Sequence, residues 1–222
     1  PNPGAYTQRA ENPSDADALA AFLASGQVPF FFTHQVLPFV SLFFGVASNL
    51  RVLEVVRHPV TLAASWYERG WGERWETDPR VFTVMADWQG HAIPWFALDW
   101  ANDFVHSSPM DRVLRSVLSL LGACDNGFGG LDDAQRDRIL FAPYEKLIGQ
   151  TQEMVEKIGG FLGSRPLPTI QEVYAREKLP KTAGSKSLSE CMALIKSHGS
   201  PDLVKKLVDA GCVYEEKWNC AP

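Results

Sequence analysis

The chain contains 222 residues, 45% of them hydrophobic, and carries a formal net charge of −5. This size and apolar content predict one α/β domain spanning residues 1–222, with a full hydrophobic core. The negative charge argues against a general nucleic-acid-binding protein, because such proteins present a basic face or stripe. The four cysteines lack the CxxC spacing of metal sites and are too few for a disulfide scaffold, although Cys212 and Cys220 could pair in an oxidising compartment.

The segment of residues 28–50 contains no Asp, Glu, Lys or Arg and is long enough to cross a membrane. Two prolines, Pro29 and Pro38, and the polar group Thr33-His34-Gln35 would divide such a helix into pieces with unsatisfied backbone groups. We therefore expect no stable membrane span, and instead a buried strand, a loop and a buried helix.

The first third of the chain predicts two helices and two strands after a capped N-terminal helix. Ser14 and the aspartates that follow it favour a helix through Leu23, which Gly26 would end. The next expected elements are a strand, a buried helix, a second strand and a helix, at Val28–Phe32, Phe39–Ala47, Arg51–Val56 and Pro59 to about Gly70.

The rest of the chain predicts further helices around one more strand. The segment Trp71–Pro79 is typical of a loop near a ligand, and Asp125–Gly130 is the clearest flexible loop. Strands that alternate with helices favour a parallel sheet covered on both faces. The expected elements are a helix at Trp88–Phe104 bent at Pro94, a helix at Met110–Leu121, a strand at Ile139–Phe141, a helix at Met154–Leu162, and two short helices after Ser187 broken at Gly199–Pro201.

One strand and the helix after it are arranged in a way that suits a bound phosphate. Arg57 follows the second strand, and Pro59 fits the first turn of the next helix, where its missing N–H costs nothing. Ligands bind at the carboxyl ends of strands in open α/β sheets, where a guanidinium can hold a phosphate through two parallel hydrogen bonds. Ser65, two turns further on, can add a hydroxyl from roughly the same side of the helix. The alternative is an ordinary strand, turn and helix in which Arg57 pairs with a nearby carboxylate.

The combination of Arg57-x-Pro59 with Ser65 resembles the 3′-phosphate-binding motif of the sulfotransferases that use 3′-phosphoadenosine 5′-phosphosulfate (PAPS). Other segments are similar to this family in the same order and spacing, so that the resemblance covers residues 28–163. They are residues 28–38, like the strand and loop of the catalytic histidine, residues 139–147, like the strand ending in Tyr-Glu-x-Leu, and residues 158–163, like the helix closing with Phe-Leu-Gly.

The resemblance implies a fold, a cofactor and a set of binding residues. The implied fold is a three-layer α/β fold of the P-loop NTPase type, with a central parallel sheet flanked by helices. The implied cofactor is PAPS, with 3′-phosphoadenosine 5′-phosphate as product and no metal. Arg57 and Ser65 would hold the 3′-phosphate, and Tyr144 would contact the adenine. Lys181 and Lys186 would supply the basic C-terminal cofactor loop.

The sequence departs from the family at the loop that cradles the 5′-phosphosulfate. The family opens with a strand, this loop and a helix, and backbone N–H groups of the loop bind the phosphosulfate. No Gly-rich basic segment precedes Thr33-His34 here, and we expect the first strand, loop and helix of the domain to be missing from the sequence. The alternative is a molecule that has lost half of its cofactor site. Phe32 also stands where the cytosolic branch of the family has a lysine.

Sulfuryl transfer needs a group that removes a proton from the attacking hydroxyl or amine, and histidine suits this task. His34 follows a strand end, and the resemblance favours it as the general base. The alternative for His34 is a core histidine that is hydrogen-bonded to a backbone carbonyl. His58 is expected either to help position the cofactor or to face solvent at the start of the helix.

The expected acceptor is a small molecule or a glycan, and the tryptophans offer candidate stacking surfaces. A cytoplasmic location is expected, with Golgi-lumenal and membrane-associated locations left open. The oligomeric state stays open between a monomer and a homo-oligomer. Two other functions stay as alternatives: a non-catalytic sulfotransferase-like binding or assembly domain, and a nucleotide or small-molecule kinase. Four charged residues could line an acceptor cleft or form a solvated helix end: Glu68, Arg69, Glu73 and Arg74.

Overall fold

The structure is a computed structural model that describes residues 15–26, 28–74, 83–181 and 186–220. It divides into two compact units, Pro1–Thr33 and His34–Pro222. In the first unit, helix α2 (Asp15–Ala24) confirms the expected N-terminal helix.

The strand expected at Val28–Phe32 is wrong, because these residues adopt no strand pairing. The side chains of Phe30, Phe31 and Phe32 are 77–80% exposed. Pro29 lacks a backbone N–H, and an apolar run becomes a strand only where a neighbouring strand satisfies its backbone groups.

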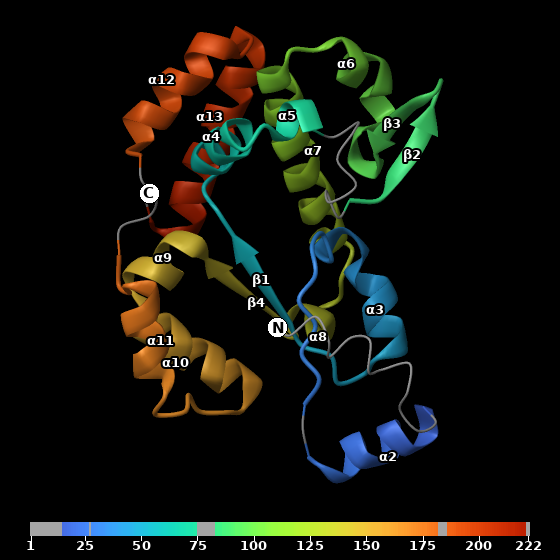
Figure 1. Cartoon of the computed structure of the whole chain (residues 1–222), viewed down its shortest axis with the longest axis vertical. Coiled ribbons are helices and arrows are strands. Elements are labelled where there is room, and N and C mark those ends of the chain that lie inside the picture. Colours follow the sequence, from blue (N-terminus) through green and yellow to red (C-terminus); the bar gives the residue numbers. More distant parts are fainter. Residues whose placement is uncertain (1–14, 27, 75–82, 182–185, 221–222) are drawn as a thin grey trace. The chain divides into compact units, whose positions relative to one another are not determined.

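The second unit is mostly helical, with short strands between the helices (Figure 1). Its elements are η2 (Leu37–Phe39), α3 (Val40–Val46), β1 (Val52–Val56), α4 (Pro59–Glu68), α5 (Trp71–Arg74), β2 (Met85–Trp88), β3 (His91–Pro94), η3 (Trp95–Trp100), α6 (Ala101–His106), α7 (Pro109–Gly129), α8 (Asp133–Arg136), β4 (Ile139–Pro143), α9 (Tyr144–Gly149), α10 (Thr151–Leu162), α11 (Ile170–Glu177), α12 (Leu188–His198) and α13 (Pro201–Trp218).

Strands β1 and β4 lie side by side in parallel, although more than 80 residues separate them in the sequence (Figure 1). Their register runs from Val52 opposite Ile139 to Val56 opposite Pro143. Two of the three strands expected from the sequence, Arg51–Val56 and Ile139–Phe141, are thus confirmed as a parallel pair. Among the described residues this pair forms a two-stranded sheet, so the observed architecture is a helical α/β arrangement around a small parallel sheet.

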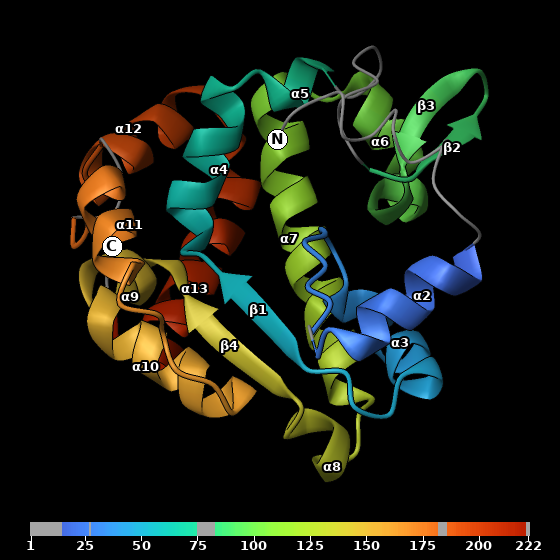
Figure 2. The same ribbon diagram turned by 60° about the horizontal axis from the view of Figure 1, so that its bottom comes forward.

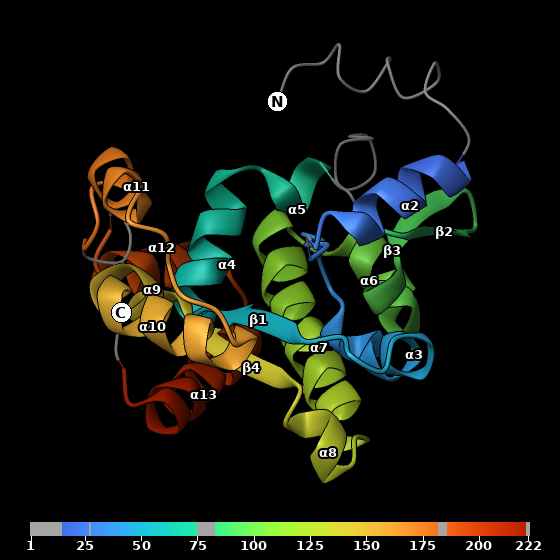
Figure 3. The ribbon, with the colours of Figure 1, turned by 90° about the horizontal axis from the view of Figure 1, so that it is seen from below.

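Helices lie on both sides of this strand pair. Figure 3 shows α13 on one side of β1 and β4 and α4 on the other, and in Figure 2 α9 and α10 lie next to β4. Phe141 of β4 contacts Phe128 of α7 at a ring-centroid distance of 5.2 Å and Trp218 of α13 at 5.4 Å. Aromatic packing therefore fixes one face of the sheet against two helices.

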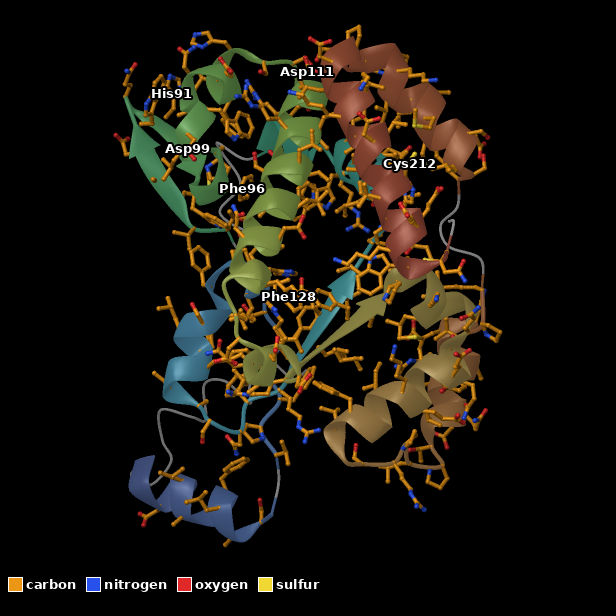
Figure 4. The ribbon with its side chains drawn as sticks, turned by 180° about the vertical axis from the view of Figure 1, so that it is seen from behind. His91, Phe96, Asp99, Asp111, Phe128 and Cys212 are labelled. Atoms are coloured by element: carbon orange, nitrogen blue, oxygen red, sulfur yellow. The ribbon has the colours of Figure 1, made fainter. Side chains whose placement is uncertain are left out.

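The largest core cluster joins α4, α7, α12 and α13. Ser108 caps the N-terminus of α7, and its hydroxyl accepts the Asp111 N–H at 3.1 Å. The Asp111 carboxylate in turn accepts the N–H of Ser200, the residue before α13, at 2.7 Å. Figure 4 shows Asp111 at the end of α7 that lies beside the C-terminal helices. The buried members of the cluster are Val60, Ala63, Ala64, Met110, Val113, Leu114, Val117, Cys191, Ile195, Val204 and Leu207.

The long helix expected at Trp88–Phe104 is wrong. Strands β2 and β3 form an antiparallel hairpin there, followed by η3 and α6. The turn between the strands has φ of 53° at Gln89 and 85° at Gly90. A two-residue turn with positive φ at both residues is the type I′ turn that joins the strands of a tight β-hairpin. Glycine adopts positive φ at little cost.

Two other expectations need correction. The flexible loop expected at Asp125–Gly130 continues α7 as far as Gly129, because Phe128 packs on the sheet. The loop expected at Trp71–Pro79 begins with the short helix α5, and its residues from 75 onward lie outside the described residues.

Helix α3 confirms the helix expected after Phe39, but it is only half-buried. Val40 and Phe44 are buried, whereas Leu42 is 70% and Val46 86% exposed. None of the helices that the structure describes is both long enough and apolar enough to span a membrane.

Glu54 in the middle of β1 generates a prediction about stability and pH. Burial raises the pKa of its carboxyl group from the usual 4.5 to about 7. Between these values the folded state keeps a proton that the unfolded state has lost, so the free energy of unfolding falls as pH rises through this range. Glu54→Gln, which mimics the protonated acid, should be more stable than the wild type at pH 8 by up to about 3 kcal/mol.

The advantage of Glu54→Gln should shrink toward pH 4, as measured by urea unfolding at several pH values. Glu172→Gln on the exposed face of α11 is the control for loss of one carboxylate. The same pH dependence in Glu54→Gln and in the wild type would contradict the assignment.

Candidate functional site

The candidate site lies where β1 and β4 end, because their register continues into the turns that follow. Val56 is opposite Pro143, so the next residues to face each other are Arg57 and Tyr144, and then His58 and Glu145. Both of these pairs are in contact. Two consecutive links therefore join the turn before α4 to the first turn of α9.

Arg57 and Tyr144, both expected to bind the cofactor, form the first link. The Arg57 guanidinium lies over the Tyr144 ring at 5.0 Å from its centroid, which is a cation–π contact. The Arg57 Nε donates to Thr61 Oγ1 at 3.3 Å. Within the described part of the chain no carboxylate pairs with Arg57, so its terminal nitrogens keep their hydrogen-bonding capacity for a ligand.

Glu145 forms the second link and is 7% exposed. Its Oε1 accepts the backbone N–H of His58 at 3.1 Å, and its Oε2 accepts the Tyr214 hydroxyl at 2.5 Å. A buried carboxylate requires such donors, since an unpaired buried charge is strongly destabilising. The carboxylate also lies at the N-terminus of α4, where the helix dipole favours negative charge.

His58 is 2% exposed and faces α13 rather than solvent, which rules out the exposed helix-start position. Its ring packs edge-on against Tyr214, with a centroid distance of 5.5 Å. Burial lowers the pKa of His58 despite the nearby Glu215 and Glu145 carboxylates. Because a carboxylate can only accept, the 3.2 Å contact between His58 Nε2 and Glu215 places a proton on Nε2.

Ser65 lies on α4 at a half-buried position, one turn beyond Thr61. The Thr61 hydroxyl donates to the carbonyl of His58 at 3.1 Å and accepts from Arg57. One face of α4 thus carries Thr61 next to Arg57 and then Ser65. The backbone N–H groups in the first turn of α4 have no partner inside the helix, and they lie at the same end of α4 as Arg57 and Thr61.

The two expected cofactor lysines occupy different places. Lys186 pairs with Glu68 at the end of α4. Burial raises the pKa of the Cys191 thiol on α12, while the charges of Lys186 and Arg57 act against this shift. Lys181 lies beside α9, where its N–H donates to the Ile148 carbonyl at 2.9 Å. Residues 182–185 between the two lysines lie outside the described residues.

His34 is exposed, and its neighbours contact the opposite end of the strands from Arg57. The next residue, Gln35, accepts the Trp95 Nε1–H at 2.5 Å. Leu37 is buried in a cluster with Ile139, the first residue of β4, and with Val52, the first residue of β1. The described contacts therefore join Arg57 to Tyr144 and Thr61, with Ser65 one turn further along α4. Lys186 contacts the far end of α4, and the residues that follow His34 contact the opposite end of the strands.

A shallow cavity of about 330 Å³ lies at the far end of α4. Its lining includes Glu68 and Glu73, two of the four charged residues expected at an acceptor cleft. Trp66 and Trp71 stack nearby with ring centroids 5.3 Å apart. The side chain of Arg74 lies outside the described residues. The cavity is lined by Tyr67, Glu68, Gly70, Gly72, Glu73 and Pro109.

The sequence interpretation missed three residues that shape this region: Thr61, Glu145 and Tyr214. A charged residue shortly after a strand, as at Glu145, two residues beyond β4, is a signal that could have been used. Tyr214 gave no such signal, because its partners lie 69 and 158 residues away in the sequence. Among the described residues, no group of three or more His, Cys, Asp or Glu side chains could hold a metal ion.

Close packing of α13 on His58 generates a prediction about two glycines. A Cβ atom at Gly211 would lie 3.0 Å from His58 Cε1 and 3.2 Å from Nε2, whereas Gly160 on α10 has open space. Gly160→Ala should raise the free energy of unfolding by up to about 1 kcal/mol, the usual helix-propensity gain. Gly211→Ala should not show this gain, because its methyl group would lie too close to the His58 ring. Urea unfolding of both variants checks the difference, and equal gains would show that His58 is not tightly held.

Comparison with known proteins adds no relative to this picture. No protein-family model, no curated protein and no solved structure matches the chain. Functional assignment therefore depends on the chemistry of the residues described above.

Proposed function

We propose that this chain binds a 3′-phosphoadenosine nucleotide at the carboxyl ends of β1 and β4 and transfers a sulfuryl group from PAPS to a hydroxyl or amine acceptor. The observation that carries the proposal is Arg57, held on the Tyr144 ring and paired with no carboxylate among the described residues. The proposal includes the larger fold, in which a central parallel sheet of the P-loop NTPase type lies between layers of helices.

The proposed phosphate site uses groups that suit a dianion. The terminal nitrogens of Arg57 can donate two parallel hydrogen bonds to a phosphate. The first-turn N–H groups of α4 favour negative charge at the same place. Ser65 adds a hydroxyl from the same helix. Lys186, which pairs with Glu68 at the far end of α4, and Lys181 are proposed as cofactor residues on the sequence resemblance alone. Tyr144 holds Arg57 in place and is proposed to contact the adenine.

The residues present fit the 3′-phosphate and adenosine half of PAPS. When bound, PAPS supplies the activated sulfuryl group. The attacking acceptor must lose a proton, and His34 is the proposed general base. This role for His34 is supported by the sequence resemblance alone. The cavity that contains Glu68 and Glu73 is the proposed acceptor region.

A second candidate function is nucleotide binding without transfer activity. This function is favoured because the residues that follow His34 contact Trp95 and the amino ends of β1 and β4, whereas Arg57 lies at the carboxyl ends. In this case the chain would keep the 3′-phosphate site and use it for regulation or assembly.

Calorimetric titration with 3′-phosphoadenosine 5′-phosphate tests the binding proposal, with AMP as the ligand that lacks the 3′-phosphate. The wild type should prefer the bisphosphate. Arg57→Ala should weaken bisphosphate binding by roughly 1.5–3 kcal/mol, the size of a charged hydrogen bond, and leave AMP binding nearly unchanged.

Arg51→Ala is the matched control for this titration. Arg51 lies at the other end of the same strand, and its guanidinium also stacks on an aromatic ring, that of Phe161 at 5.4 Å. Equal effects of the two substitutions, or no preference of the wild type for the bisphosphate, would overturn the proposed site.

Turnover of PAPS with a phenol and an amine acceptor tests the catalytic proposal. His34→Ala should lower kcat by about 100-fold or more, since a positioned general base contributes at least this much. His91→Ala, at an exposed position in β3, is the control (Figure 4). Bisphosphate binding without turnover in the wild type would select the non-catalytic alternative, and full turnover by His34→Ala would rule out His34 as the base.

A further inference from the structure

We propose that Tyr214, on the C-terminal helix α13, is a positioning residue for the nucleotide site. It holds Glu145 so that the turn before α4 presents Arg57 to the 3′-phosphate. This inference rests on the proposed function. It extends the site to a helix that carries none of the expected binding residues.

Two links join the turn after β1 to the first turn of α9. Glu145 directly follows Tyr144, and His58 directly follows Arg57. The Glu145–His58 hydrogen bond therefore fixes the backbone next to the Arg57–Tyr144 contact. If this hydrogen bond were lost, the β1–α4 turn could move relative to Tyr144. Bidentate binding of a phosphate depends on orientation, so such a movement would weaken it.

Tyr214 controls the orientation of the Glu145 carboxylate. Its hydroxyl lies 2.5 Å from Glu145 Oε2 and 3.4 Å from the carbonyl oxygen of Val56, the last residue of β1. Burial and the Glu145 carboxylate raise the pKa of the Tyr214 phenol, so the phenol stays protonated and donates to the carboxylate. Tyr214 is 6% exposed, which keeps water from replacing it.

Other residues on the same face of α13 hold the same turn. Gly211, Tyr214 and Glu215 are spaced by three and four residues, which places them on one face of the helix. Glu215 accepts from His58, and the absence of a Cβ at Gly211 lets the His58 ring approach the helix. In the part of the chain that the structure describes, His58 Nδ1 has no hydrogen-bond partner. The ring is thus held mainly by its contacts with α13.

The preference for 3′-phosphoadenosine 5′-phosphate over AMP separates a positioning role from a general structural role. Tyr214→Phe keeps the ring and removes the hydroxyl, which leaves Glu145 Oε2 without its donor. We expect bisphosphate affinity to fall roughly 5- to 30-fold, corresponding to one buried hydrogen bond, while AMP affinity changes little. Cys212→Ser, on the exposed side of the same helix, should change neither affinity (Figure 4).

Two substitutions of Glu145 provide a second, independent measurement. Glu145→Ala removes both hydrogen bonds and should lower the preference for the bisphosphate as Tyr214→Phe does. Glu145→Gln keeps an oxygen for the His58 N–H and an amide group that can donate to the Tyr214 oxygen. It should therefore restore most of the preference.

The possible results separate this inference from the proposed function. If the wild type prefers the bisphosphate and Arg57→Ala removes the preference, but folded Tyr214→Phe and Glu145→Ala retain it, the positioning role is wrong and the nucleotide site stands. If the wild type shows no preference, the proposed function fails and this inference fails with it. A parallel loss in Arg57→Ala, Tyr214→Phe and Glu145→Ala, with recovery in Glu145→Gln, supports both.

Discussion

The buried carboxylate of Glu145 is the constraint on which the arrangement of this protein depends. Removing a carboxylate from water costs several kcal/mol unless donors surround it. Here the donors come from two distant parts of the chain, the His58 N–H and the Tyr214 hydroxyl. The turn after β1, the turn after β4 and the helix α13 must therefore meet at one point. That meeting places Arg57 beside Tyr144 and gives the structure its candidate phosphate site.

The parts of the fold that could be predicted from the sequence are those with local causes. The strand before Arg57 follows from its run of β-branched residues, and the start of α4 follows from Pro59. The break between α12 and α13 follows from Gly199 and Pro201. For the candidate site, the order of a strand, an arginine and a helix predicts that Arg57 lies at the end of β1 and before α4, where the structure has it. The contact of Arg57 with Tyr144 was not predicted, because it depends on the pairing of two distant strands.

The parts that could not be predicted depend on tertiary contacts or on turn geometry. The β2–β3 hairpin depends on positive φ at Gln89, a residue that rarely adopts it. Helix α7 continues through a glycine-rich segment because Phe128 packs on Phe141 and holds its last turns in place. The orientation of His58 toward α13 depends on Gly211, more than 150 residues away in the sequence. No local pattern contains such information.

The links that follow the strand ends have a consequence for how the chain folds. A slip of β1 against β4 by one residue would reverse which face of the sheet each side chain occupies. It would also separate Arg57 from Tyr144 and leave Glu145 without the His58 N–H. The correct register is therefore the one in which the Arg57–Tyr144 and His58–Glu145 contacts form. The free-energy cost of a slip comes from these contacts, which lie outside the strands. Because the segment between the two strands is long, bringing its ends together is entropically costly. The contacts at the strand ends offset this cost only in the correct register.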